Sequence, residues 1–215
     1  MSASRRFEPE AHFSTAEVQE HAARFGTWIF LASEILLFSG LFALYAAYRT
    51  MYGASFDRGV REDDLAIGTT NTLILIGSSF TVALSLAEVR RGRRRFALLL
   101  LSVSILLGAV FLTLKGFEWA AHFHQGILPG RHYRPHDAAL RAFGTNTFFT
   151  LYFFMTGLHA LHVVGGLCVL GWFTIAIARG VYGPERYVPF ECGTLYWHLV
   201  DIVWFFLWPL FYLAR

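Results

Sequence analysis

Five long apolar segments, separated by polar connections, limit the fold of this chain more than any other feature of its sequence. Each reaches about the length, roughly 20 residues, that an α-helix needs to cross the hydrocarbon core of a bilayer. The backbone finds no water inside a bilayer, so such a segment has to be helical. We therefore predict an all-α fold, a polytopic membrane bundle of five transmembrane helices that forms a single domain over residues 25–215. The predicted spans are residues 25–48, 67–89, 96–119, 143–178 and 196–213.

The composition supports a membrane protein and argues against several functions. Only 15% of the 215 residues are charged, whereas soluble domains average about 25%. The net charge of +3 is small, and no basic patch with interleaved aromatic residues indicates nucleic-acid binding. The two cysteines, Cys168 and Cys192, do not have the spacing of a haem-attachment or zinc motif. The sequence also contains no phosphate-binding or dinucleotide-binding glycine motif, so we predict no self-sufficient active site.

The ends of the spans predict the orientation in the membrane. The run from Arg90 to Arg95 is the densest basic cluster in the chain, and such clusters stay in the cytoplasm. Five spans then place the N-terminus in the cytoplasm and the C-terminus in the periplasm or outside. We expect residues 1–24 to form a cytoplasmic or interfacial arm that ends in a short helix. Ser14 to Glu17 fits the capping box that begins such a helix.

Glu34 is the one charged residue in an otherwise apolar stretch from Trp28 to Tyr45. A carboxylate near the middle of a membrane helix opposes insertion by roughly 2.5–3.5 kcal/mol on insertion scales. Such a residue has to face protein or water, bind a partner, or stay protonated. From the residues alone, a functional site and a strut between two helices explain Glu34 equally well.

His159 and His162 are three residues apart, so both lie on one face of the fourth span. They could be two metal ligands, or they could donate hydrogen bonds to carboxylates or carbonyls of neighbouring helices. A metal site needs three or four ligands, and the other histidines do not repeat a compact pattern. We therefore favour hydrogen bonding and predict no metal site.

Four other polar residues fall within the spans or at their ends. His198 and Asp201 form either an intrahelical pair or a clamp to another span, and we favour the clamp. Glu118 is interpreted as a surface anchor or as one partner of an interhelical bond. Asn71 precedes a stripe of small hydroxyl residues in the second span, which favours close helix packing.

Five groups of residues, in order along the chain, resemble the signatures of subunit III of the haem-copper oxidases. Together they extend from about residue 25 to residue 213, and five in sequence are far more specific than any one alone. The residues that carry the resemblance are Gly26-Thr-Trp-Ile-Phe-Leu-Ala-Ser-Glu34 with Phe38-Ser-Gly-Leu-Phe42, Asn71-Thr72 with Ser78-Ser79, Lys115-Gly-Phe-Glu-Trp119, Phe153-Phe-Met-Thr-Gly-Leu-His-Ala-Leu-His-Val-Val-Gly-Gly166, and Tyr196-Trp-His-Leu-Val-Asp-Ile-Val-Trp204.

The resemblance implies an accessory subunit of a bacterial inner-membrane oxidase that reduces dioxygen to water and pumps protons. The expected partners are subunit I as the main contact, subunit II, a small subunit IV and membrane lipids. No catalytic residue, haem or copper is expected in this chain, because the redox centres of the family belong to partner subunits. The resemblance is compatible with a phospholipid bound to this chain. The chain corresponds to the short five-helix form, since longer members carry two additional helices.

The resemblance also assigns roles to individual residues. Glu34 matches a buried glutamate that faces subunit I in the family, and we expect it to be largely protonated. The other polar residues are expected to form an intramembrane network: His159, His162, His198, Asp201, Glu118 and Asn71.

Three alternatives remain open at the level of sequence. The chain could serve a quinol oxidase instead of a cytochrome c oxidase, because the electron donor binds elsewhere. It could be the subunit III-like protein of a nitric oxide reductase system, which shares the five-helix plan. The most distant alternative is a histidine-based membrane metal protein.

Overall fold

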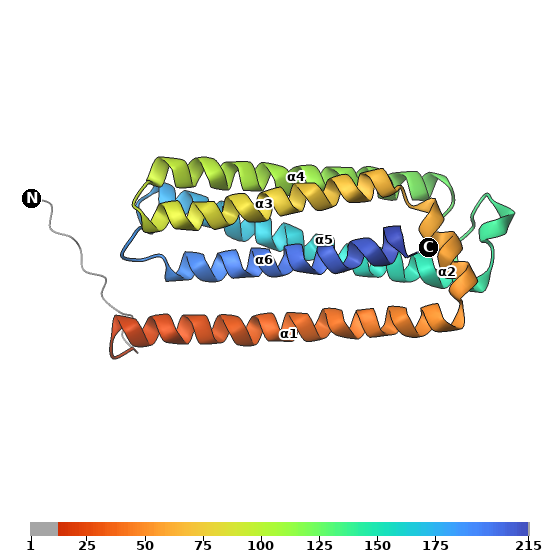
Figure 1. The fold of residues 1–215 in the computed structure, drawn as a ribbon, viewed down its shortest axis with the longest axis horizontal. Helices are drawn as coiled ribbons and strands as arrows, with labels where there is room; N and C mark the ends of the chain where they lie inside the picture. The colour runs from red at the N-terminus through yellow and green to blue at the C-terminus, as the bar shows by residue number, and fades with distance from the viewer. Residues whose placement is uncertain (1–12, 215) are drawn as a thin grey trace, which may run out of the picture.

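The structure is a computed structural model that describes residues 13–214, and those residues contain helices but no β-strand. Five helices are long and apolar enough to cross a membrane, which confirms the predicted all-α bundle. They run along the long dimension of the molecule (Figure 1). The α-helices are α1 (Ala16–Met51), α2 (Gly53–Glu62), α3 (Leu65–Arg90), α4 (Arg94–His124), α5 (Phe143–Ala178) and α6 (Val188–Trp208). Shorter pieces are the 3-10 turns η1 (Gly130–His132) and η2 (Ala138–Leu140) and the π-helical η3 (Pro209–Leu213).

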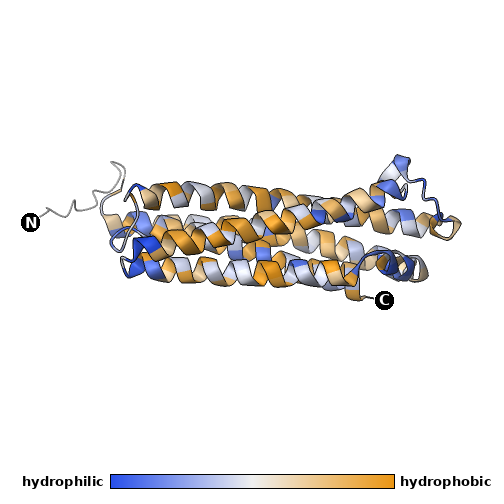
Figure 2. Ribbon diagram, turned by 90° about the horizontal axis from the view of Figure 1, so that it is seen from above, coloured by the Kyte–Doolittle hydropathy of each residue, from blue (hydrophilic) through white to orange (hydrophobic). Residues whose placement is uncertain are grey.

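Polar residues gather at the two ends of the bundle and apolar residues cover its middle (Figure 2). One end holds the start of α1, the basic α3–α4 connection and the α5–α6 connection (Figure 1). The opposite end holds α2, the segment between α4 and α5, and the C-terminus. This separation is the one expected for helices that cross a bilayer.

The first helix begins earlier than the predicted span and includes part of the predicted arm. α1 continues without a break from Ala16 through residue 24, and the remainder of the predicted arm, residues 1–12, lies outside the described residues. The helix cap is Thr15 rather than Ser14: its backbone is extended, and its hydroxyl accepts from the Val18 N–H at 3.2 Å. Glu17 therefore lies in the first turn, where an acid stabilises the helix dipole.

The last helix also begins earlier than predicted, at Val188 instead of residue 196. Pro189 lies in its first turn, where a missing N–H breaks no helical hydrogen bond. Glu191 makes this turn more polar than the rest of the helix. In the structure it pairs with Arg24, 3.1 Å away, and with Arg90, so the carboxylate joins α1, α3 and α6 at the basic end.

Small residues bring the helices close together. Ser78 of α3 donates to the Ser104 carbonyl of α4 at 3.2 Å, and Thr81 lies 2.7 Å from the Ser104 hydroxyl. The Trp197 ring of α6 is completely buried. It lies against Gly166 of α5 and Gly108 of α4, where a side chain would collide with the ring. Glycine is required at both positions because the indole occupies that volume.

α1 is the least buried of the five spanning helices. At the end away from the basic loops, the Tyr45 hydroxyl donates to the Leu210 carbonyl at 2.7 Å. The Tyr45 ring also meets Phe56 of α2 and Phe211 edge-on. These contacts, with the Arg24 pair at the other end, fix α1 to the bundle near both of its ends. A third, polar contact lies between them.

Candidate functional site

The contact between the two ends of α1 is a pair formed by Glu34 and His162. Oε2 of Glu34 lies 2.8 Å from Nε2 of His162 on α5. The two side chains are only 17% and 15% exposed, and Phe38 covers the imidazole with a ring contact of 5.2 Å. The structure therefore gives the carboxyl of Glu34 a hydrogen-bonding partner within this chain.

The second nitrogen of His162 determines how protons are shared in this pair. Nδ1 lies 2.8 Å from the Leu158 carbonyl, which can only accept, so Nδ1 carries a proton. One further proton then lies between Nε2 and Glu34. It belongs either to a carboxylic acid beside a neutral imidazole or to an imidazolium beside a carboxylate. Both forms are electrically neutral overall, which lowers the cost of placing the pair inside a membrane.

A second polar cluster is buried near the end of α4 that lies away from the basic loops. Nζ of Lys115 lies 3.0 Å from Oε1 of Glu118, and both side chains are almost inaccessible. Lys115 also donates to the hydroxyls of Tyr152 at 2.8 Å and Tyr212 at 2.7 Å. Both tyrosines donate in turn to Glu118. Glu118 thus joins α4 to α5 and to η3, and it is an interhelical partner rather than a surface anchor.

Asp63 and His122 extend this cluster towards the end of the bundle. Nε2 of His122 lies 3.1 Å from Oδ1 of Asp63, and both residues are buried. Nδ1 of His122 lies 3.1 Å from the Glu118 carbonyl. Asp63 lies in the connection between α2 and α3, outside the spans. Burial raises the pKa of its carboxyl from 3.8 to about 6, although His122 opposes the shift.

The raised pKa predicts how the stability of this end depends on pH. Between pH 4 and 6 the folded chain retains on Asp63 a proton that the unfolded chain has lost, so stability falls as pH rises through this window. Asp63→Asn is neutral at every pH and should remove that part of the decline. Thermal unfolding of the wild type and the variant at several pH values between about 4 and 7 tests this. An equally steep decline in the variant would assign the pH dependence to other groups.

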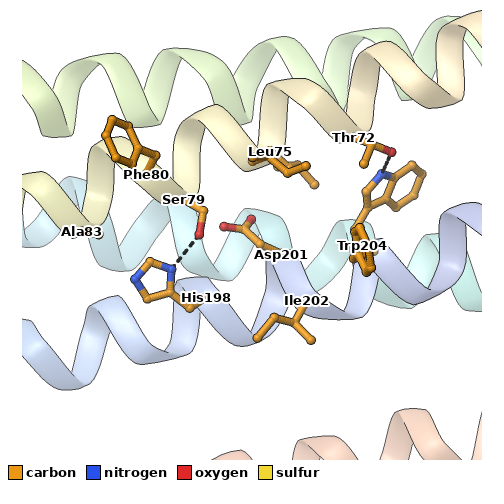
Figure 3. Close-up of a pocket in the computed structure, with 11 residues that line it drawn as sticks. Thr72, Leu75, Ser79, Phe80, Ala83, His198, Asp201, Ile202 and Trp204 are labelled. Atoms are coloured by element: carbon orange, nitrogen blue, oxygen red, sulfur yellow. Dashed lines mark hydrogen bonds between the residues drawn. The ribbon is translucent and has the colours of Figure 1, made fainter.

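The third polar group lies between α3 and α6 (Figure 3). Nδ1 of His198 is 2.7 Å from the Ser79 hydroxyl, so His198 connects α6 to α3 and does not pair with Asp201. The Asp201 carboxylate lies beside Ser79 (Figure 3). Its oxygens are inaccessible and accept no hydrogen bond of normal geometry among the described residues. These side chains line a pocket of about 340 Å³.

The remaining predicted residues are buried without polar partners. His159 lies 5.7 Å from Phe111 and 5.2 Å from Trp204, ring to ring, and neither of its nitrogens has a hydrogen bond within residues 13–214. The Asn71 amide is likewise unpaired there and fully buried. In that part of the chain, no three His, Cys, Asp or Glu side chains converge as metal ligands would. The residues of the predicted network are therefore divided among three separate groups, and His159 and Asn71 belong to none of them.

Lys115 and its tyrosine partners were not among the site residues predicted from the sequence. One signal was present: Lys115, Glu118 and His122 are three and four residues apart, which places them on one face of α4. A polar stripe of this kind predicts polar partners on the neighbouring helices. No spacing identifies Tyr152 and Tyr212 as those partners, because they come from helices that only the tertiary fold brings together.

Comparison with known proteins identifies the family to which the chain belongs. Residues 8–214 match the family model described as cytochrome c oxidase subunit III. The chain is 34% identical over 194 residues to cytochrome c oxidase subunit 3 of Thermostichus vulcanus, which covers 87% of this chain and 85% of that relative. It is 28% identical over 194 residues to the probable cytochrome c oxidase subunit 3 of Nocardia farcinica, covering 88% and 87%.

A third relative is named for a different electron donor. The quinol oxidase subunit 3 of Bacillus subtilis (strain 168) is 29% identical over 191 residues, covering 87% of this chain and 85% of that relative. The family match extends over all five spans, and the relatives include subunits named for both cytochrome c and quinol oxidases. This chain is therefore a member of the haem-copper oxidase subunit III family.

Proposed function

We propose that this chain is an accessory subunit of a respiratory terminal oxidase, most closely a cytochrome c oxidase, in a bacterial inner membrane. The match of residues 8–214 to the subunit III family carries this proposal. In it, the haems and copper belong to partner subunits that reduce dioxygen to water and pump protons. This chain stabilises catalytic subunit I and supports its proton and dioxygen supply. Subunit II and a small subunit IV complete the proposed complex.

The Glu34–His162 pair is the proposed contact point with subunit I. Its support is geometric: the pair retains some exposure, and the neighbouring Ile35 and Leu36 of α1 are 49% and 72% exposed. Exposed apolar side chains around a proton-sharing pair are more consistent with a contact to another membrane subunit than with a pair that only links two helices inside this chain. The pair would then hold one exchangeable proton at the boundary between two subunits.

The proposed orientation has the basic end of the bundle in the cytoplasm. The Arg90–Arg95 run and the start of α1 lie at the same end of the bundle (Figure 1), and short basic loops remain cytoplasmic. The C-terminus then lies on the periplasmic side. A lipid chain fits a groove of about 330 Å³ that includes Phe30 of α1, Val169 of α5 and Tyr196 of α6, and we propose a phospholipid there.

Purification of the complex through an affinity tag on this chain tests the proposed function. We expect a haem-bearing subunit I to co-purify, together with a copper-containing subunit II. A quinol oxidase without that copper centre would support the alternative suggested by the Bacillus relative. Co-purification with a nitric oxide reductase pair, or of this chain alone with bound metal, would contradict the proposal.

Glu34→Gln is expected to leave the complex assembled while removing the shared proton. The amide has nearly the shape of a carboxylic acid, and its NH₂ can donate to Nε2 of His162 as the acid does. A hydrophobic carbodiimide, which reacts with protonated carboxyls, should modify Glu34 in the wild-type complex and spare that site in the variant. Mass spectrometry of the modified chain and the subunit ratio of the purified complex provide the two measurements. Modification confined to other residues, or loss of the chain from the variant complex, would count against this role.

A further inference from the structure

The pocket between α3 and α6 has no role in the function proposed above. Its volume of about 340 Å³ falls within the range of about 300–1,000 Å³ that small-molecule sites occupy. Ile76, Phe80 and Ile202 line it and are 53%, 64% and 54% exposed. The pocket therefore opens on the outer face of the bundle, towards the lipid or the subunit that surrounds these helices.

The depth of the pocket limits the ligands that can reach it. Ser79 lies about halfway along α3, and Asp201 lies about halfway along the segment Val188–Leu213. The centre of a bilayer is roughly 15 Å from either headgroup layer. A phosphate headgroup does not reach that depth, so a ligand that enters from the bilayer has to be uncharged and lipophilic.

The hydrogen bonds in the pocket are incomplete in every protonation state. The Ser79 hydroxyl has one proton. If it donates to His198, a carboxylate at Asp201 receives no donor from Ser79. If His198 donates to Ser79, the hydroxyl can serve Asp201, but the second ring nitrogen of His198 is then an acceptor without a donor. If Asp201 is itself protonated and donates to Ser79, the outer His198 nitrogen bears a hydrogen without an acceptor.

In each case the outer nitrogen of His198, Nε2, lacks a partner among the described residues. A ligand hydroxyl can pair with this nitrogen in either form because a hydroxyl both donates and accepts. An unpaired polar group is unfavourable in an apolar environment, so the pocket favours a ligand that supplies the missing hydrogen-bonding partner. The rest of the lining indicates the shape of that ligand. Phe80, Trp204 and Phe205 provide aromatic surfaces around the polar groups, and such surfaces suit a flat ring.

We propose that this pocket binds an uncharged, membrane-soluble ring compound that bears a hydroxyl group, the chemistry of an isoprenoid quinol. The ring packs against Phe80 and Phe205, and the hydroxyl bonds to the outer nitrogen of His198, Nε2. The proposal concerns binding and assigns no electron transfer to this chain. It does not depend on the identity of the oxidase, since it rests on the depth, lining and unpaired groups of the pocket.

Photolabelling of the intact purified complex in lipid nanodiscs tests this proposal. The probe is an azido-substituted benzoquinone reduced to its quinol, with decylubiquinol as the competitor. We expect labelled peptides from residues 76–83 and 198–205, and less label when the competitor is present. Ala83→Phe, at an exposed position on the pocket lining, should reduce labelling about tenfold, because the new ring fills the ligand's volume.

Two further variants separate a binding site from nonspecific partitioning. His198→Phe keeps a flat ring but removes the nitrogen that pairs with the ligand hydroxyl, so labelling should fall several-fold without loss of assembly. Ala109→Phe makes the same change as Ala83→Phe at an exposed position on α4, away from the pocket, and should leave labelling unchanged. Equal labelling in Ala83→Phe and Ala109→Phe would overturn the proposal. So would a crosslink showing that a helix of another subunit fills the pocket.

Discussion

Lys115→Met is expected to destabilise the chain by about 3–5 kcal/mol, the cost of removing one partner from a buried ion pair. Methionine has a similar length and fills the volume, so the loss is electrostatic rather than steric. Glu118 would keep the hydroxyls of Tyr152 and Tyr212 but lose the cation 3.0 Å from its Oε1. Its second oxygen already has no hydrogen bond within residues 13–214. Thermal unfolding of the purified complex, monitored by release of this chain, measures the effect.

The matched control removes both charges. Lys115→Met combined with Glu118→Gln leaves no uncompensated anion, and replacing both members of a buried pair is often close to neutral. We therefore expect the double variant to regain most of the stability that the single variant loses. A double variant as unstable as Lys115→Met would show that the cluster acts through packing and not through its charges.

Gly166→Leu is expected to cost about 3 kcal/mol, at the upper end of the range for overpacked cores. A Cβ at this position would lie 2.6 Å from Cε3 of Trp197, and the buried indole cannot move away. On the α4 side, a Cβ at Gly108 would lie 2.9 Å from the same ring. The ring is thus confined by two helices, and α5 and α6 would have to separate.

This separation should also disturb the proposed functional pair. The Tyr196 hydroxyl donates to the His162 carbonyl at 3.2 Å, one helical turn from Gly166, and that bond joins the same two helices. The extent to which a carbodiimide modifies Glu34 should therefore differ between Gly166→Leu and the wild type. Gly171→Leu is the control, because a Cβ at Gly171 meets no atom within 4 Å. Equal stability of the two variants would mean that the close approach of α5 and α6 is not required.

The five spans could be predicted because hydropathy and length alone determine which segments cross a bilayer. α2 could not be predicted in this way. It has only ten residues and several of them are polar, so hydropathy and length do not mark it as a span. Its buried apolar side chains are Phe56 and Val60. Phe56 packs edge-on against Tyr45 of α1 and Phe148 of α5, with ring distances of 5.2 and 5.4 Å. The helix is therefore stabilised by contacts between segments that are distant in the sequence.

The polar residues of the spans were visible in the sequence, but their partners were not. An acid in an apolar helix indicates that a partner exists, and Glu34 was found for that reason. Its partner His162 is 128 positions away, and spacing along one helix gives no information about a second helix. The same limit applies to Ser79, which looked like a packing residue and instead bonds to His198.

The proposed role of this chain is to serve an oxidase without carrying a redox centre itself. Its most direct test is to compare the purified complex with and without this chain, by optical spectrum, metal content and dioxygen consumption. We predict that the complex without this chain keeps its full haem and copper content and still reduces dioxygen at first, while its stability or sustained turnover declines. Loss of haem or copper in proportion to this chain would contradict the account.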